Sequence, residues 1–342
     1  MLRSLIKIML IGLLVTHFGC ADDDTEYNFI DRLRVLGISG DPPWLEPGES
    51  TTLSALTIPQ PRTDTRIEYV WEWCPLNLGP QTGYACAFTE EELQAVIDEQ
   101  LGPDMFEVPS FLIGTSTSAA NIEYTYDLPP EFVRGICDFF QNQELPALVE
   151  PPDCTNGYPL TIISTVRQIE RTTNQEGPAD SPGPTRIRAI KTINLLFEED
   201  AERNNNPHLG ELFVIDPRDQ SRQRVALDGS TTLDRDITYT LEVELDESES
   251  ESYLYTPPDS DVPELRREAL TLTWFIEAGS TDSQRTGFIE GVSTLEQARS
   301  NEWTTPREPD YGDNTARVFI VIRDGRLGTS WIERSFTLTP SS

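Results

Sequence analysis

Five cysteines carry the chemistry that this sequence defines best. Cys20 closes an apolar N-terminal stretch, and Cys74, Cys86, Cys137 and Cys154 follow in the body of the chain. Four cysteines in an exported chain favour two disulfide bonds, and three connectivities satisfy them. Joining Cys74 to Cys86 and Cys137 to Cys154 closes the shortest loops and has the lowest entropy cost. A zinc site is the alternative, although no CxxC spacing supports it.

The residues that carry most nucleophilic and acid–base chemistry are scarce. After the leader, Lys191 is the single lysine and His208 the single histidine. A Ser-His-Asp triad, a His-rich zinc site or a Schiff-base lysine therefore has one candidate at most. Carboxylates are numerous, but a glycosidase needs two at a defined separation in a cleft, which the sequence does not reveal. We therefore predict no catalytic residue, no metal site and no cofactor, and expect a protein that is not an enzyme.

Acidic loops leave calcium binding as an alternative. Oxygen ligands are available from Asp310, Asp313 and Asn314 in DYGDN, and from Asp259 and Asp261. The spacing does not match an EF-hand, so plain turns are the simpler interpretation.

The N-terminus has the three parts of a secretory signal peptide spanning residues 1–19. Arg3 and Lys7 supply positive charge, residues 8–15 form an apolar run, and small residues follow at Gly19 and Ala21. The run is too short to span a bilayer, which needs roughly 20 apolar residues. The chain is therefore expected to be exported.

Gly19 and Cys20 after this run resemble the lipobox of bacterial lipoproteins. In that family the cysteine becomes the first residue of the mature chain and carries acyl groups such as palmitate. The family usually has Leu where His17 stands, so cleavage before Asp22 by ordinary signal peptidase, releasing a soluble secreted protein, is the alternative. Ala21 after the cysteine implies, by the same resemblance, a lipid anchor in the outer membrane.

The charge of the exported chain limits its partners. Removing residues 1–19 leaves 24 basic and 58 acidic residues, a net charge of −34. Such a field repels nucleic acid and anionic headgroups. We expect membrane contact through the lipid on Cys20, an envelope protein or polysaccharide as partner, and no nucleic acid.

Alternating apolar residues predict a mainly β protein made of two tandem immunoglobulin-like β-sandwiches. The expected parts are a flexible spacer at 20–29, a first domain at 30–198, a linker at 199–208 and a second domain at 209–340. Strands are expected near 32–39, 51–58, 67–73, 122–128, 160–169, 187–195, 212–215, 223–227, 237–245, 270–276, 318–322 and 331–338.

Residues 75–157 interrupt this pattern as a small helical, disulfide-stapled insertion. Thr89 followed by Glu92 is a capping box that predicts a helix over 91–100, and Pro130 can start a second helix through Phe140. Insertions of this kind often carry function.

The tryptophans mark both sandwich cores. Trp71, Trp73 and Trp274 alternate with polar residues and are expected in the core. Tryptophans also lie near turns, where facing a ligand is the alternative to packing: Trp44, Trp303 and Trp331.

Two motif series resemble bacterial surface modules. A strand, a PP…PGE turn, a second strand and then Trp73 resemble the start of the immunoglobulin-like domains of surface lipoproteins in predatory or social, myxobacteria-like Gram-negative bacteria. The W-x-x-x-A-G strand from Trp274, the W-T-x-P turn from Trp303 and the R-D-G-R-x-G hairpin from Arg323 resemble a PKD-type module.

The resemblance implies a membrane-anchored, non-catalytic binding or structural module of the cell envelope. The alternatives are a secreted carboxylate-type hydrolase with its cleft in the insertion, or a calcium-stiffened adhesion module.

Overall fold

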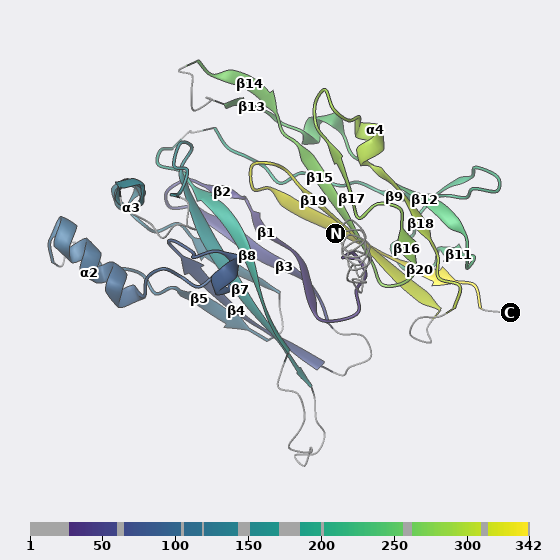
Figure 1. The fold of residues 1–342 in the computed structure, drawn as a ribbon, viewed down its shortest axis with the longest axis horizontal. Coiled ribbons are helices and arrows are strands. Elements are labelled where there is room, and N and C mark those ends of the chain that lie inside the picture. Colours follow the sequence, from purple (N-terminus) through teal and green to yellow (C-terminus); the bar gives the residue numbers. More distant parts are fainter. Residues whose placement is uncertain are drawn as a thin grey trace, which may run out of the picture.

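The computed structural model describes two β-sandwiches that lie side by side (Figure 1). The described residues are 27–59, 65–103, 106–117, 120–142, 151–170, 185–199, 202–255, 262–308 and 314–340. The signal peptide, Cys20 and the calcium candidates Asp259, Asp261, Asp310 and Asp313 lie outside these ranges. The mainly β architecture with two sandwiches confirms the fold class expected from the apolar alternation.

The first sandwich packs a sheet of three strands against a sheet of five. The three-stranded sheet has the order β1 (Arg34–Asp41), β3 (Ser50–Ile58) and β6 (Asn121–Thr125). The five-stranded sheet has the order β2 (Trp44–Leu45), β8 (Thr185–Leu195), β7 (Tyr158–Glu170), β4 (Thr65–Cys74) and β5 (Leu112–Ser116). β2 pairs in parallel with β8, so the chain crosses from one sheet to the other just after β1. Trp71 is fully buried between the sheets, as its alternation with polar residues predicts.

The segment 75–157 contributes to both sheets as well as forming helices. Its helices are η2 (Pro80–Thr82), α2 (Glu90–Leu101) and α3 (Pro130–Asn142). The capping box is present, because Thr89 Oγ1 accepts from Glu92 N at 3.2 Å while Glu92 Oε2 accepts from Thr89 N at 2.9 Å. Between the helices, β5 extends the sheet beside β4 and β6 pairs with β3. The helices therefore decorate two strand connections of the sandwich.

Both disulfide bonds close short loops. Cys74 is bonded to Cys86 and Cys137 to Cys154, with Cα–Cα separations of 5.7 and 6.2 Å. This confirms the connectivity favoured by closure entropy.

The second sandwich repeats the plan of the first. One sheet has the order β10 (Arg222–Arg224), β9 (Leu212–Ile215), β12 (Thr238–Val243), β18 (Ser300–Thr304) and β16 (Ser280–Thr281). The other has the order β11 (Thr232–Leu233), β20 (Thr329–Leu338), β19 (Thr315–Arg323), β15 (Leu270–Ile276) and β17 (Arg285–Phe288). β11 pairs in parallel with β20, as β2 does with β8. A short helix, α4 (Leu295–Ala298), precedes β18.

The acidic segment at 246–264, where no strand is expected, holds regular structure. It contains η3 (Glu247–Glu249) and the antiparallel hairpin of β13 (Ser252–Tyr255) and β14 (Glu264–Arg267), which projects beyond the sandwich (Figure 1). The guanidinium of Arg266 lies 3.7 Å from the ring centroid of Tyr255 across this hairpin. Most residues of this two-stranded ribbon are exposed, which is why charged side chains are tolerated in it.

Trp303 packs in a core, so the ligand-facing alternative does not hold for it. Trp303 lies within β18, is fully buried, and its indole donates to Ala278 O at 3.0 Å. The W-T-x-P motif therefore marks the end of a core strand, and no ligand reaches this ring.

The disulfide between Cys137 and Cys154 should stabilise the decorated first sandwich. We expect the double variant Cys137→Ser/Cys154→Ser to lose about 3 kcal/mol of unfolding free energy, because the open loop gains entropy in the unfolded chain. Urea titration monitored by tryptophan fluorescence measures this loss. Reducing the double variant should then remove only the contribution of Cys74–Cys86, and an unchanged urea midpoint in the unreduced variant would contradict the prediction.

Candidate functional site

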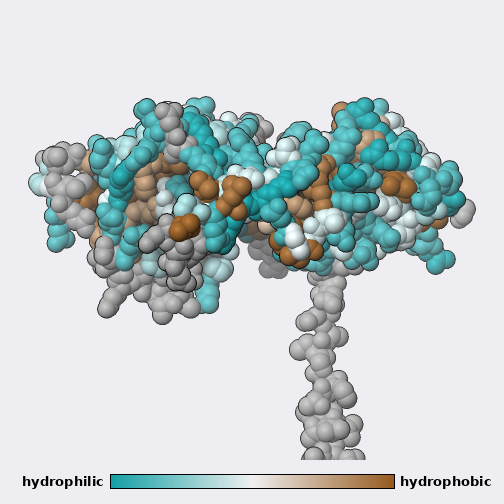
Figure 2. All heavy atoms as spheres, turned by 90° about the horizontal axis from the view of Figure 1, so that it is seen from above, coloured by the Kyte–Doolittle hydropathy of each residue, from teal (hydrophilic) through white to brown (hydrophobic). Residues whose placement is uncertain are grey.

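The two sandwiches meet through an apolar contact, here called the joint. Figure 2 shows the two lobes meeting side by side, with a mostly hydrophilic face and small brown groups. The buried apolar residues of the joint come from the N-terminal segment, β1, β3, β15 and β19: Ile30, Leu36, Leu56, Ile58, Phe275, Phe319 and Val321. The partly buried Trp331 of β20 packs against them, so it faces the joint and not a ligand in solvent.

Strands at the joint are apolar on both faces. In β3, Leu53 points into the core of the first sandwich, whereas Leu56 packs in the joint. β19 divides its residues in the same way, with Ile320 in the core of the second sandwich and Phe319 in the joint. Two apolar faces are the signature of a strand covered on both sides.

A bulge in β1 brings the sandwiches close together. The pairing of β1 with β3 shifts between Val35 and Gly37. A Cβ atom at Gly37 would lie 3.2 Å from Cγ1 of Val321, so the backbone approaches the second sandwich where a side chain would crowd it.

The turn between β19 and β20, residues 324–328, carries the central polar contacts of the joint. The guanidinium of Arg326 lies 4.5 Å from the ring centroid of Trp44 and 4.7 Å from that of Tyr253. Its carbonyl oxygen accepts from Trp44 Nε1 at 2.8 Å and from Asn204 Nδ2 at 2.9 Å. Trp44 is 5% exposed, so it belongs to the joint and not to an open ligand site.

Asp324 shapes this turn from within. Its Oδ1 accepts from the backbone N–H groups of Arg326 and Gly328, each at 2.7 Å, and its Oδ2 accepts from Asn204 Nδ2 at 3.1 Å. Burial raises the pKa of Asp324, against the lowering effect of these donors. Leu327 has a φ of 83°, so the turn holds a conformation that L side chains rarely adopt.

The described part of the predicted linker lies in the joint. Asn206 Nδ2 donates to Gly40 O at 2.8 Å, and Asn206 Oδ1 accepts from Thr329 N at 2.8 Å. Arg203 pairs with Glu46 at 2.6 Å and with Glu49 at 3.0 Å. The linker is thus bonded to both sandwiches.

A pocket of about 330 Å³ opens at the edge of the joint, here called the joint pocket. It lies between β1, β8 and the β19–β20 turn, and both Lys191 and Arg323 line it. Lys191 is 7% exposed and its Nζ donates to Leu327 O and, at 3.1 Å, to Thr329 Oγ1. Burial lowers the pKa of Lys191 to about 8, opposed by the nearby Asp324.

Glu268 is the buried acid of the joint. It is 2% exposed and lies 3.4 Å from Arg326. Burial, followed by repulsion from Asp324, raises the pKa of Glu268 to about 7, although Arg326 acts in the opposite direction. The loss of hydration therefore raises the pKa of Glu268 more than the ion pair with Arg326 lowers it.

The decorated connections of the first sandwich hold two smaller features. An apolar cavity of about 50 Å³ lies between α2 and α3. A groove of about 630 Å³ runs along α2 and is lined by acidic residues that include Glu90, Glu91, Asp98 and Glu107. Three of these four are exposed, and Glu90 Oε1 accepts from Ser110 Oγ at 3.0 Å. An open groove lacks the enclosed surroundings that keep a catalytic carboxylic acid protonated, so it does not favour the hydrolase alternative.

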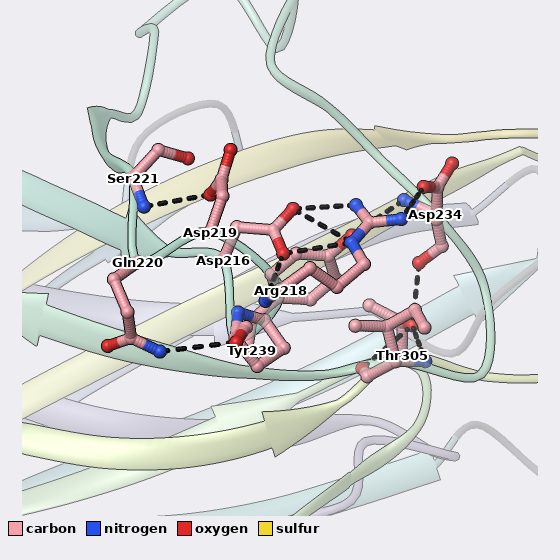
Figure 3. A network of polar contacts seen from close by, with 10 residues as sticks. Asp216, Arg218, Asp219, Gln220, Ser221, Asp234, Tyr239 and Thr305 are labelled. Atoms are coloured by element: carbon pink, nitrogen blue, oxygen red, sulfur yellow. Dashed lines mark hydrogen bonds and ion pairs between the residues drawn. The ribbon is translucent and has the colours of Figure 1, made fainter.

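A second polar network surrounds the turn between β9 and β10 (Figure 3). Arg218 pairs with Asp216 at 2.6 Å and with Asp234 at 2.7 Å, and Asp234 N donates to Tyr239 Oη at 3.0 Å. The hydrogen bond from Arg218 lowers the pKa of Asp216 to about 2. The three guanidinium nitrogens of Arg218 and the backbone N–H of Asp234 each have an acceptor within the network. We therefore assign the network to holding the β9–β10 turn against the segment between β11 and β12.

Asn314 and His208 are two described candidate residues that lie outside the joint. Asn314 Oδ1 accepts from Arg235 Nη2 at 2.9 Å. His208 is exposed, and its backbone N–H donates to Glu249 Oε2 at 2.6 Å. Within the described ranges, no group of three or more His, Cys, Asp or Glu residues is arranged to hold a metal ion. None of the helices that the structure describes is long and apolar enough to span a membrane.

Sequence reasoning missed the joint. The signal was present in the apolar residues on both faces of β3 and β19, a pattern typical of strands that are covered on both sides. It was also present in the R-D-G-R-x-G motif, which predicts a hairpin but does not reveal what its Arg326 contacts.

The chain matches no protein-family model and no curated protein sequence. Among solved structures it is similar to Salmonella alpha-2-macroglobulin reacted with methylamine, with 10% identity and a TM-score of 0.21, over 90% of this chain and 17% of that one. It is also similar to three N-terminal domains of the outer capsid protein Hoc of bacteriophage RB49, with 11% identity and a TM-score of 0.17, over 90% of this chain and 69% of that one. At these scores neither likeness bears on function.

Asn206 should stabilise the joint more than its neighbour Asn205. Asn206→Ala leaves Gly40 O and Thr329 N without their partner, so we expect a loss of about 1–3 kcal/mol in unfolding free energy. Asn205 is exposed and bonds to Glu251, so Asn205→Ala is a matched control expected to lose about 0.5 kcal/mol or less. Urea titration measures both, and equal losses would contradict this role for Asn206.

The buried Glu268 makes the free energy of unfolding depend on pH within a defined window. Because the folded pKa of Glu268 is about 7, above its ordinary 4.5, the folded state binds its proton more tightly than the unfolded chain. The contribution of Glu268 is therefore present below pH 4.5 and is lost as the pH rises through 7.

Glu268→Gln removes this titration, so the variant should gain stability relative to the wild type as the pH rises across that window. Unfolding free energies measured at several pH values test this, with Glu264→Gln in the exposed strand β14, which ends just before Glu268, as the control. Parallel pH profiles for Glu268→Gln and the wild type would refute the expectation.

Proposed function

We propose that this protein is a lipid-anchored protein of the cell envelope whose two β-sandwiches act as one rigid, non-catalytic binding or structural body. The observation that carries the proposal is the joint. Its apolar residues are buried, and its polar contacts run from the linker and the β19–β20 turn to both sandwiches. A flexible pair of domains would not need a buried Arg326 between two aromatic rings.

The N-terminal segment supports an anchor attached at the joint. Ile30 N donates to Ile276 O at 2.9 Å, and Ile276 N donates to Asn28 O at 3.0 Å, so the chain first lies along β15 of the second sandwich. It then enters β1 of the first sandwich. A pull on the N-terminus therefore acts where the two bodies meet, instead of at one end of the molecule.

The length of the spacer limits the height of the body above a membrane. Six residues, 21–26, separate Cys20 from Tyr27. Even fully extended, this stretch reaches at most roughly 25 Å. An acylated Cys20 would thus hold both sandwiches close to the bilayer surface, where they are available to envelope proteins or polysaccharides.

Acylation of Cys20 is the first test. Expressed with its leader in a Gram-negative host, the wild-type chain should incorporate radiolabelled palmitate and fractionate with outer membranes. Cys20→Ser should do neither, because the serine hydroxyl does not form the thioether that a thiol forms. Cys86→Ser is the matched control, since it removes a cysteine in the folded body and should leave labelling intact.

Intact mass before and after reduction provides an independent measurement. The proposal expects a chain that begins at Cys20, carries acyl groups, and gains the hydrogens of two reduced disulfides. A mass that starts at Asp22 without lipid would refute the anchor, because the mature chain would then lack Cys20.

A further inference from the structure

The joint pocket contains two positive groups that form no ion pair with a described carboxylate, although Asp324 also lines it. Among the described residues, neither Lys191 nor Arg323 forms an ion pair, whereas Arg326 and Arg317 do. Lys191 bonds only to Leu327 O and Thr329 Oγ1. Arg323 donates to Leu36 O at 2.7 Å and to Thr273 Oγ1 at 3.4 Å. Two such cations are unexpected in a chain with a net charge of −32.

Both side chains retain hydrogen-bond donors. An ammonium has three N–H donors and a guanidinium five. Each uses two within the described structure, so both have donors left to bind a further acceptor. Burial lowers the pKa of both groups, which means that each charge is poorly solvated where it lies. A bound anion would relieve that cost.

Asp324 lines the joint pocket and acts on Lys191 through its charge, but no ion pair joins the two side chains in the described structure. Its oxygens accept from Asn204 Nδ2 and from the N–H groups of Arg326 and Gly328. Lys191 is affected by two charged neighbours, Asp324 and Arg323, and these have opposite effects on its pKa. The ammonium therefore remains available to a ligand.

The rest of the joint pocket combines polar groups of Asp324, Thr192 and Thr329 with an apolar wall. Val35, Leu36, Ile38, Ile190 and Leu327 contribute to its wall. Its volume of about 330 Å³ is at the lower end of ordinary ligand sites and holds on the order of ten water molecules. Inorganic ions would leave most of this wall in contact with water.

We propose that the joint pocket binds a small organic carboxylate, with its charged end at Lys191 and Arg323 and its short hydrocarbon part against the apolar wall. This goes beyond the proposed function, because a rigid anchored body needs no ligand. Its test concerns binding alone and does not depend on the anchor.

Butanoate is the probe. Titrated into the purified mature protein, it should raise the melting temperature in a saturable manner, since a ligand that binds only the folded state stabilises it. Sodium chloride at the same ionic strength, n-butanol and inorganic phosphate should each have a smaller effect. Phosphate that equals butanoate would overturn the assignment to an organic carboxylate.

Three variants locate the site. Lys191→Met should weaken butanoate binding by about tenfold or more, the usual effect of losing a hydrogen bond to a charged group. Arg188→Met removes one exposed cation from the same strand outside the joint pocket and should bind like the wild type. Ile190→Trp keeps Lys191 and its bonds but fills the pocket from its partly exposed rim, and it should abolish binding even if Lys191→Met does not fold.

The pH dependence of butanoate affinity distinguishes binding at Lys191 from an unspecific effect. Because its pKa is about 8, the ammonium loses its charge as the pH rises further, and wild-type affinity should fall about tenfold or more by about pH 9.5. Lys191→Arg keeps the charge and should retain affinity there. Equal binding by the wild type and Ile190→Trp, or a wild-type affinity that does not change with pH, would overturn the proposal.

Discussion

Arg326 brings together more of this molecule than any neighbouring residue of its turn. Its guanidinium lies between Trp44 of the first sandwich and Tyr253 of the hairpin, within 3.6 Å of Glu202 and 3.4 Å of Glu268. Its carbonyl oxygen accepts from Trp44 and Asn204. A cation buried in this way is tolerated only where partners replace the water it has lost. The relative placement of the sandwiches, the linker and the hairpin all depend on meeting that requirement.

The strong negative charge of the chain opposes contact between the two sandwiches at the joint. Two acidic sandwiches repel each other, and the repulsion grows as salt is removed. The apolar contact around Leu56 and Phe319 does not depend on salt, and the cations gathered nearby, such as Arg203 and Arg326, offset the repulsion locally. The joint therefore combines hydrophobic burial with ion pairs that join its cations to nearby acids. Its pocket differs in that Lys191 and Arg323 form no ion pair among the described residues.

The fold itself shows how decoration and core are separated. In both sandwiches a short strand pairs in parallel with the last strand, β2 with β8 and β11 with β20, although the two domains have different insertions. The first carries its helices and disulfides between β4 and β7, and the second carries a projecting hairpin between β12 and β15. Insertions at connections leave the packed faces of Trp71 and Trp274 intact.

The sequence by itself determined the local structure. Period-two alternation identified the main strands, the capping box identified α2, and loop length favoured the disulfide pairs, because each depends on residues close together in the chain. Only the tertiary structure decided that Trp303 lies in a core, that residues 246–264 include a hairpin, and that Lys191 and Arg323 share a pocket. Those features depend on contacts between residues far apart in the chain. The second face of a strand, such as Leu56 in β3, acquires its role only when another body covers it.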